Sequence, residues 1–160
     1  TPLYSSAASD VYKRQVALSP CILPQIGKPT FTLADDEMEI GMGIHGEPGI
    51  ARSKLESADA ITTTLIERIM GDIDLRGAEV TIMLNSLGAT PLEELYIMYS
   101  RVLSLFSAAD VRVYRPYIGR FATSMEMAGA SITVMKLDTE LKRLLDAPAS
   151  SPFFDNAQYM

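Results

Sequence analysis

The chain alternates short apolar runs with two amphipathic helical patterns, and this alternation restricts the folds that it can adopt. Every apolar run in the 160 residues has the length of a strand, well short of the roughly 20 residues with which a helix crosses a bilayer. No internal repeat or low-complexity linker interrupts the pattern. We therefore expect one α/β domain without a transmembrane helix: a two-layer mixed β-sheet of about five or six strands with helices mainly on one face.

The ends of helices give the clearest local signals. Ser57 is a candidate N-cap for a helix with an apolar stripe formed by Ile61, Leu65, Ile69 and Met70. Residues 90–93, Thr-Pro-Leu-Glu, match a capping box, which predicts a helix to about Phe106. Asp138 can cap a third helix over residues 139–145. The expected strands are residues 16–21, 30–33, 38–44, 80–84, 111–117 and 132–137, in an order that the sequence does not reveal.

The first fifteen residues differ from the rest. Residues 1–15 are polar, lack the apolar stretch of a signal peptide and show no periodicity of a packed element. Residues 5–15 also resemble translated read-through of a sequencing adapter. We expect residues 1–15 to be disordered or foreign to the domain, the domain to occupy residues 16–154, and residues 155–160 to form a tail.

Charge and cysteine content exclude several classes of partner. The chain has 14 Lys and Arg against 20 Asp and Glu, a formal net charge of −6, which disfavours nucleic acid and anionic membrane surfaces. Cys21 is the single cysteine, so an intramolecular disulfide and a multi-thiolate metal site are excluded. We interpret Cys21 as a small buried apolar residue and the protein as cytoplasmic.

The single histidine, His45, lies in the most unusual segment, residues 41–49, with the sequence Gly-Met-Gly-Ile-His-Gly-Glu-Pro-Gly. The strand period of two puts His45 on the same face as Glu39, Gly41 and Gly43. Glycines allow close approach of a ligand, so the imidazole could act as a base, a ligand or a covalent nucleophile. The glycines could equally serve packing and a tight turn around a hydrogen-bonded surface histidine, because a lone histidine lacks the second group of a triad.

Other candidate sites are weaker. The histidine and Glu47 give too few ligands for zinc or a similar ion, and the glycines do not match a nucleotide-binding P-loop. Residues 85–90 fit a strand-to-helix turn better than an anion site. The side chains of Tyr114, Tyr117 and Phe121 could line an interface, but aromatics in such a strand are usually packing residues. We expect no metal or nucleotide site in this chain.

Four segments together resemble the substrate-binding subunit of dihydroxyacetone kinases. They are residues 27–31 (Gly-Lys-Pro-Thr-Phe), 38–49 (Met-Glu-Ile followed by the histidine segment), 87–95 (Leu-Gly-Ala-Thr-Pro-Leu-Glu-Glu-Leu) and 123–129 (Thr-Ser-Met-Glu-Met-Ala-Gly). They occur in the family's order. The resemblance implies the second domain of that subunit, in an architecture similar to DhaK and DegV.

The resemblance also implies a chemical role for His45. It matches the histidine that binds dihydroxyacetone covalently as a hemiaminal and presents it for phosphorylation. The family's other reactive histidine, its aspartate base and a glycine-rich loop would lie in an N-terminal domain that this chain does not contain. The chain would then be an inactive fragment of an enzyme subunit.

The same resemblance implies partners. ADP/ATP and Mg would be held by a nucleotide-binding, L-type kinase subunit or domain, and the complete protein would be a homodimer. Because the chain ends soon after residues 146–148, we favour the phosphoenolpyruvate-dependent phosphotransferase type. An alternative is a dihydroxyacetone-sensing coactivator paralogue without phosphotransfer, and a third reading is a chiefly structural domain that forms a dimer interface and one wall of the cleft.

Overall fold

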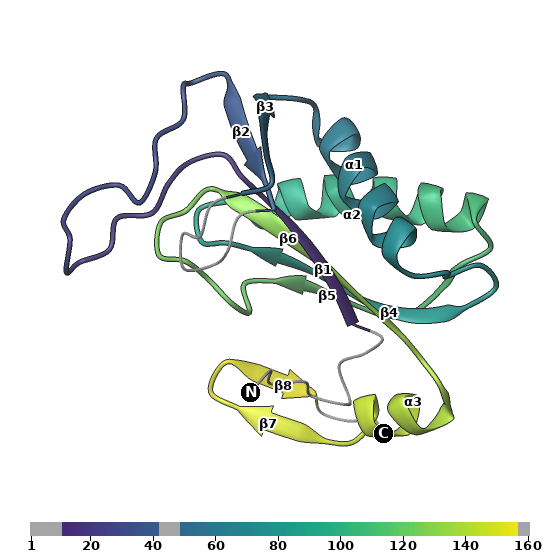
Figure 1. Cartoon of the computed structure of the whole chain (residues 1–160). Coiled ribbons are helices and arrows are strands. Elements are labelled where there is room, and N and C mark those ends of the chain that lie inside the picture. Colours follow the sequence, from purple (N-terminus) through teal and green to yellow (C-terminus); the bar gives the residue numbers. More distant parts are fainter. Residues whose placement is uncertain (1–10, 42–48, 157–160) are drawn as a thin grey trace, which may run out of the picture.

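The computed structural model describes residues 11–41 and 49–156 and shows one mixed sheet with three helices (Figure 1). The elements are β1 (Val11–Ala17), β2 (Glu37–Ile40), β3 (Ala51–Lys54), α1 (Ala58–Asp72), β4 (Glu79–Ser86), α2 (Leu92–Ala108), β5 (Arg112–Gly119), β6 (Gly129–Lys136), α3 (Thr139–Leu145), β7 (Ala149–Ser151) and β8 (Phe154–Asn156).

The main sheet has six strands in the order β3-β2-β1-β6-β4-β5. Within this sheet, the strands β4 and β5 are parallel to each other, and all other neighbouring strands are antiparallel. Helices α1 and α2 lie side by side on one face, while α3 and the hairpin β7–β8 lie on the other (Figure 1). The predicted fold class, a two-layer α/β domain with its long helices on one face, is confirmed.

The core lies between the sheet and the two long helices. Helix α1 buries Ile61, Leu65, Ile66 and Ile69, and α2 buries Leu95, Met98, Val102 and Phe106. These side chains meet the apolar positions of β4 and β6, which are spaced two apart: Val80, Ile82, Leu84, Ala130, Ile132 and Val134. The apolar stripe predicted for α1 is confirmed, because Ile61, Leu65 and Ile69 are buried and Met70 is partly buried against the core.

Two of the three predicted helix caps are confirmed. The Ser57 hydroxyl accepts from the Ala60 N–H at 3.3 Å, and the Asp138 carboxylate accepts from the Leu141 N–H at 2.7 Å. The predicted capping box at residues 90–93 is wrong, because α2 has Pro91 at its N-cap and no side-chain cap. The Thr90 hydroxyl instead accepts from the backbone N–H of Gly129 on β6, at 2.8 Å.

The first strand begins five residues earlier than expected. Residues 11–15, which we assigned to the N-terminal segment, pair with β6 from Val11↔Met135 to Gln15↔Ser131. A strand ladder is made by backbone groups and tolerates a polar sequence, and here Tyr12 packs on the core while Arg14 forms an ion pair with Asp72 of α1.

Two further regions differ from the predictions, and part of one predicted strand is not tested. The strand predicted at residues 30–33 is wrong, since that region contributes the single bridge Ile22↔Pro29. Residues 42–44 of the predicted strand 38–44 lie outside the described residues. The hairpin β7–β8 was not foreseen, and it extends two residues into the predicted tail.

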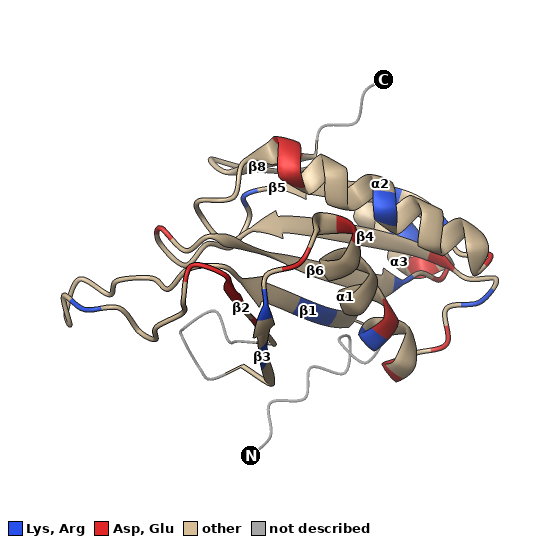
Figure 2. Ribbon diagram, turned by 90° about the horizontal axis from the view of Figure 1, so that it is seen from above, with Lys and Arg blue, Asp and Glu red and all other residues tan. Residues whose placement is uncertain are grey.

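Charged side chains are dispersed over the ribbon. Figure 2 shows Lys and Arg interspersed with Asp and Glu along the helices, the β2–β3 hairpin and the loops. Among the described residues, no helix is long and apolar enough to cross a membrane.

Candidate functional site

His45, which we predicted to carry the chemistry, falls within residues 42–48 and lies outside the described residues. The described chain stops at Gly41 after β2 and resumes at Gly49 before β3. The Gly41 N–H donates to the Gln15 carbonyl at 2.8 Å, and the Ile50 N–H donates to the Ile40 carbonyl at 2.8 Å. Both ends of the histidine-bearing connection are therefore tied to the sheet.

A buried carboxylate lies beside these two ends. Glu39 on β2 is 7% exposed. One of its oxygens accepts from the Gly49 N–H at 2.6 Å, and the other pairs with the Arg52 guanidinium on β3 at 3.0 Å. Because Glu39 lies between Met38 and Ile40, which face the helix-side core, its side chain lies on the opposite face of the sheet.

The two described glycines of the histidine segment have a steric role. Gly41 has a φ of +82°, and a Cβ there would lie 2.7 Å from the Ile50 side chain. A Cβ at Gly49 would lie 2.5 Å from Cγ of Glu39. Close packing of the hairpin end thus accounts for both glycines, as one of the two readings of the sequence anticipated.

Residues 85–90 form a strand-to-helix turn, as we expected. The Asn85 side chain accepts from the N–H groups of Phe121 and Ala122 and donates to the Ala122 carbonyl. Three backbone N–H groups of the turn are used internally, because Leu87 donates to Gly129, Gly88 to the Ser86 hydroxyl and Ala89 to Met127. The turn therefore braces the ends of β4 and β5, and these three donors are not directed at an anion.

Cys21 is a buried apolar residue, as predicted. It is 0% exposed and packs with Ala17, Leu87 and Met127 in a small second core on the face away from α1 and α2. The Ser124 hydroxyl approaches its sulfur at 3.4 Å. This contact joins the loop after β1 to the loop before β6.

A cavity of about 290 Å³ opens on the helix-covered face. Its lining is mainly apolar, with Val16 and Met98 among the lining residues and the carboxylates of Glu56 and Glu94 as charged groups. On β1 and β2, Val16 is opposite Ile40 and Ala17 is opposite Glu39. Because side chains alternate between the two faces along a strand, Glu39 lies on the face of the sheet opposite to that of Val16. The cavity therefore belongs to a different surface from the β2–β3 hairpin end.

Comparison with known proteins settles the family. The family model described as the Dak1 domain matches residues 3–153. The chain belongs to the Dak1 family. It is 42% identical to the "PTS-dependent dihydroxyacetone kinase 2, dihydroxyacetone-binding subunit DhaK" of Listeria innocua, over 92% of this chain and 45% of that protein. The resemblance drawn from the four sequence segments is confirmed.

Relatives of this Dak1 domain carry names for more than one function. A D-erythrulose kinase of Mycolicibacterium smegmatis is 39% identical over 87% of this chain and 24% of its own length. Among solved structures, the dihydroxyacetone kinase operon co-activator DhaQ superposes with a TM-score of 0.82 and 31% identity, over 89% of this chain and 45% of that one. The Dak1 domain described here spans less than half the length of these relatives.

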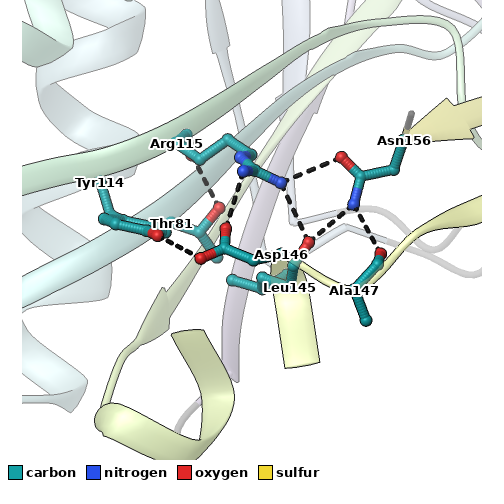
Figure 3. A network of polar contacts seen from close by, with 7 residues as sticks. All are labelled: Thr81, Tyr114, Arg115, Leu145, Asp146, Ala147 and Asn156. Atoms are coloured by element: carbon teal, nitrogen blue, oxygen red, sulfur yellow. Dashed lines mark hydrogen bonds and ion pairs between the residues drawn. The ribbon is translucent and has the colours of Figure 1, made fainter. Parts of the chain in front are cut away.

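The C-terminal part of the Dak1 domain is held by a polar network that the sequence did not reveal (Figure 3). Arg115 on β5 pairs with Asp146 at 2.7 Å and also donates to the Leu145 carbonyl at 2.9 Å and the Asn156 side chain at 3.0 Å. Tyr114 donates to the other Asp146 oxygen at 2.5 Å, and this hydrogen bond is the main reason why the pKa of Tyr114 is raised. The network connects α3 and β8 to the edge of the main sheet.

Two of the three aromatic residues named from the sequence, Tyr117 and Phe121, pack against other aromatic rings. The ring of Tyr117 lies 6.3 Å from that of Phe121 and 5.8 Å from that of Phe154 on β8. Tyr114 takes part in the polar network instead. The described residues contain no cluster of three or more His, Cys, Asp or Glu side chains placed to hold a metal ion.

Proposed function

We propose that this Dak1 domain is part of a dihydroxyacetone kinase and that His45 binds dihydroxyacetone covalently. The observation that carries the proposal is membership of the Dak1 family, together with the sequence block 41–49 that contains the single histidine. The names of the relatives support it, because several of them are dihydroxyacetone-binding subunits. Names of this kind identify the class of substrate rather than the residue.

The proposed bond is a hemiaminal. A lone pair on one ring nitrogen of neutral His45 attacks the carbonyl carbon of dihydroxyacetone, and the carbonyl π electrons move to the oxygen. The proton of the other ring nitrogen is lost while the new alkoxide gains one, so that a neutral adduct forms and no leaving group is needed. The adduct fixes the substrate's terminal hydroxyl for phosphoryl transfer, which lowers the entropic part of the barrier.

The proposed active site also needs groups from an N-terminal domain of the same subunit and from a nucleotide-binding partner. We propose that an N-terminal domain supplies the acid/base groups and that an L-type kinase subunit holds ADP/ATP with Mg, in a phosphoenolpyruvate-dependent system. A cytoplasmic homodimer is the proposed state of the complete protein. On its own, the chain is expected to bind substrate without turning it over, because acid/base catalysis needs a group at hydrogen-bond distance from the reacting hydroxyl.

A second candidate is a sensor that binds dihydroxyacetone without phosphotransfer. The structural similarity to the DhaQ co-activator, at a TM-score of 0.82, favours it specifically. Both candidates predict substrate binding by His45. They differ in whether the protein, completed with the N-terminal half that its relatives carry, transfers phosphate to dihydroxyacetone.

The experiment that tests the proposal is titration of the chain with dihydroxyacetone labelled with ¹³C at the carbonyl. Adduct formation replaces the carbonyl resonance by that of a saturated carbon, and His45→Ala should abolish the new signal. His45→Gln is a second variant that keeps a polar side chain of similar size. A new signal of equal intensity in both variants would show that another residue binds the substrate.

A further inference from the structure

Helix α2 carries a second apolar stripe beside the one that it buries in the core. This second stripe, which we call the outer seam, consists of Leu92, Tyr96, Tyr99 and Leu103. Leu92 is 48% exposed, Tyr96 is 57% exposed and Leu103 is 43% exposed. Tyr99 is partly buried against the core. Apolar side chains that are exposed singly are common, but a contiguous row of them indicates an interaction surface.

The outer seam lies on the flank of α2 that faces away from α1. Successive residues of a helix are about 100° apart, which puts the seam almost opposite Arg101. The Nε of Arg101 donates to the Thr63 hydroxyl of α1 at 3.0 Å. Figure 2 shows α1 on one side of α2 only. On the sheet beneath α2, the edge strand is β5, so the seam runs along an open margin of the described fold.

The neighbouring edge of the sheet is poorly suited to binding an added strand. Pro116 lies within β5 and has no backbone N–H. The pairing of β5 with β4 also shifts register between Val80 and Thr81, and irregularities of this kind twist an edge strand away from a regular ladder. This margin therefore offers a partner the apolar seam of α2 rather than backbone hydrogen bonds.

The seam has the same sequence in both directions. Its residues are Leu, Tyr, Tyr and Leu, at intervals of four, three and four, and such intervals are those of helices that pair side by side. When two copies of α2 run antiparallel about a twofold axis at the middle of the seam, Leu92 meets Leu103 of the other copy. Tyr96 meets Tyr99 in the same way. Because a twofold interface must be self-complementary, this symmetry favours a second copy of the chain over an unrelated partner.

Charge does not oppose the pairing. At about 100° per residue, the solvent-side border of the seam is formed by Glu93, Ser100 and Ser107, so Glu93 is the charged side chain of that border. In the antiparallel arrangement the two copies of Glu93 lie roughly 14 Å apart along the axis, beyond the Debye length of about 8 Å in physiological salt. The two serines are small and allow the helices to approach closely.

The size of the seam fits a weak dimer. Helix α2 has 17 residues, which corresponds to a length of about 25 Å. Its half-exposed leucine and tyrosine side chains leave roughly 300 Å² of apolar surface open in each copy. Pairing removes about twice this area, and with the bordering side chains the total approaches about 1,000 Å², the lower limit for a specific interface. We therefore expect reversible association that depends on concentration.

We propose that two copies of this Dak1 domain associate through their outer seams, with the α2 helices packed antiparallel. The proposal gives the proposed homodimer an interface, and in that respect it rests on the proposed function. It involves no residue of the substrate site, so that association and adduct formation can fail separately.

Analytical ultracentrifugation of the full 160-residue chain over a range of concentrations measures the association. Tyr96→Lys puts a charge at the centre of the seam and is expected to weaken association at least roughly tenfold, because the pairing would bury an unpaired charge. Ile97→Lys is the matched control, since Ile97 is 53% exposed on the same helix but lies outside the seam. It should associate as the original chain does.

Thermal unfolding shows that both variants are folded. An original chain that stays monomeric at every concentration would overturn the proposal. Equal association of Tyr96→Lys and Ile97→Lys would also overturn it, because the contact would then be made by another surface.

Cysteine cross-linking tests the antiparallel arrangement. Leu92 and Leu103 are separated by about 16 Å along one helix, too far for a disulfide within one chain. The double variant Leu92→Cys, Leu103→Cys should therefore form a cross-linked dimer under mild oxidation, while Leu92→Cys alone should not. Cys21 is buried and does not compete. Efficient cross-linking of Leu92→Cys alone would contradict the antiparallel seam.

The dimer and the substrate site have separate outcomes. Tyr96→Lys should still give the adduct signal with ¹³C-labelled dihydroxyacetone. A monomeric original chain that forms the adduct would overturn the seam alone, and a dimer that forms no adduct would overturn the proposed function alone.

Discussion

Arg115 and Asp146 lie 31 residues apart in sequence, and their side chains meet at 2.7 Å. This ion pair connects β5 to the end of α3, a helix with no buried residue of its own. Polar contacts and the aromatic cluster around Phe154 therefore attach α3 and β8 to the main sheet, in place of buried apolar side chains.

Arg115→Met is expected to loosen the C-terminal elements selectively. The substitution removes contacts with Asp146, the Leu145 carbonyl and Asn156. Because the ion pair is partly solvated, we expect a loss of about 1–2 kcal/mol in the free energy of unfolding. Amide exchange should rise in α3, β7 and β8 and stay unchanged in β4. Arg112→Met, at an exposed position of the same strand, is the control, and equal effects of the two variants would contradict the assignment.

The C-terminal elements are also expected to loosen at alkaline pH. The pKa of Tyr114 is raised mainly by its hydrogen bond to Asp146, with burial and the Asp146 charge adding to the shift and Lys142 and Arg115 opposing it. A raised pKa means that the folded state holds the proton more tightly, so the stabilisation is complete below the unfolded pKa of about 10 and is lost as the pH rises through the folded value.

Tyr114→Phe should reduce this loss without abolishing it. The pKa of Lys142 is also raised, chiefly by its hydrogen bond to Glu79, and its contribution disappears in the same direction. Denaturant unfolding on both sides of pH ~10 measures the difference. An identical alkaline loss in Tyr114→Phe would show that the tyrosine does not contribute.

Asn85→Ala is expected to destabilise the whole domain. Asn85 is 2% exposed and makes four hydrogen bonds, accepting from Phe121 and Ala122 and donating to the Ala122 carbonyl and Ser131. Leaving these buried groups without partners should cost about 2–4 kcal/mol. Thr81→Val removes one hydrogen bond, to the Arg115 carbonyl, and should cost about 1 kcal/mol. Equal costs in urea unfolding would contradict the proposed brace.

Substrate selection should follow from the carbonyl group. A hemiaminal needs a carbonyl group, so the chain should bind dihydroxyacetone and also erythrulose, the substrate named in several relatives, but not glycerol. Binding measured by calorimetry tests this selection. Glycerol binding as tight as that of dihydroxyacetone would argue for recognition of hydroxyl groups alone.

The sequence predicted the parts of the fold that depend on local patterns. Helix α1, with its Ser57 cap, and strand β4 follow from apolar periods and from residues near in sequence. The capping box at Thr90 failed because a tertiary donor, Gly129, takes its hydroxyl. The strand at residues 11–15 was missed because its sequence is polar and shows no apolar period. It is recognised by its backbone pairing with β6, which the sequence of these residues does not reveal.

The surroundings of the site were harder to foresee. The block around His45 suggested the residue and its glycines, but nothing local marked Glu39 as the partner of Gly49, ten residues away. The network of Arg115, Asp146 and Asn156 joins three elements whose neighbourhood depends on strand order. Such contacts follow from the topology, which a single sequence does not specify.

The covalent role of His45 can be tested directly because the chain has a single histidine. Incorporating ¹⁵N-histidine labels that ring alone, and dihydroxyacetone labelled with ¹³C at the carbonyl supplies the other nucleus. A one-bond coupling between a His45 ring nitrogen and the substrate carbon is the predicted result. Saturating binding without that coupling, with the carbonyl resonance intact, would contradict the hemiaminal.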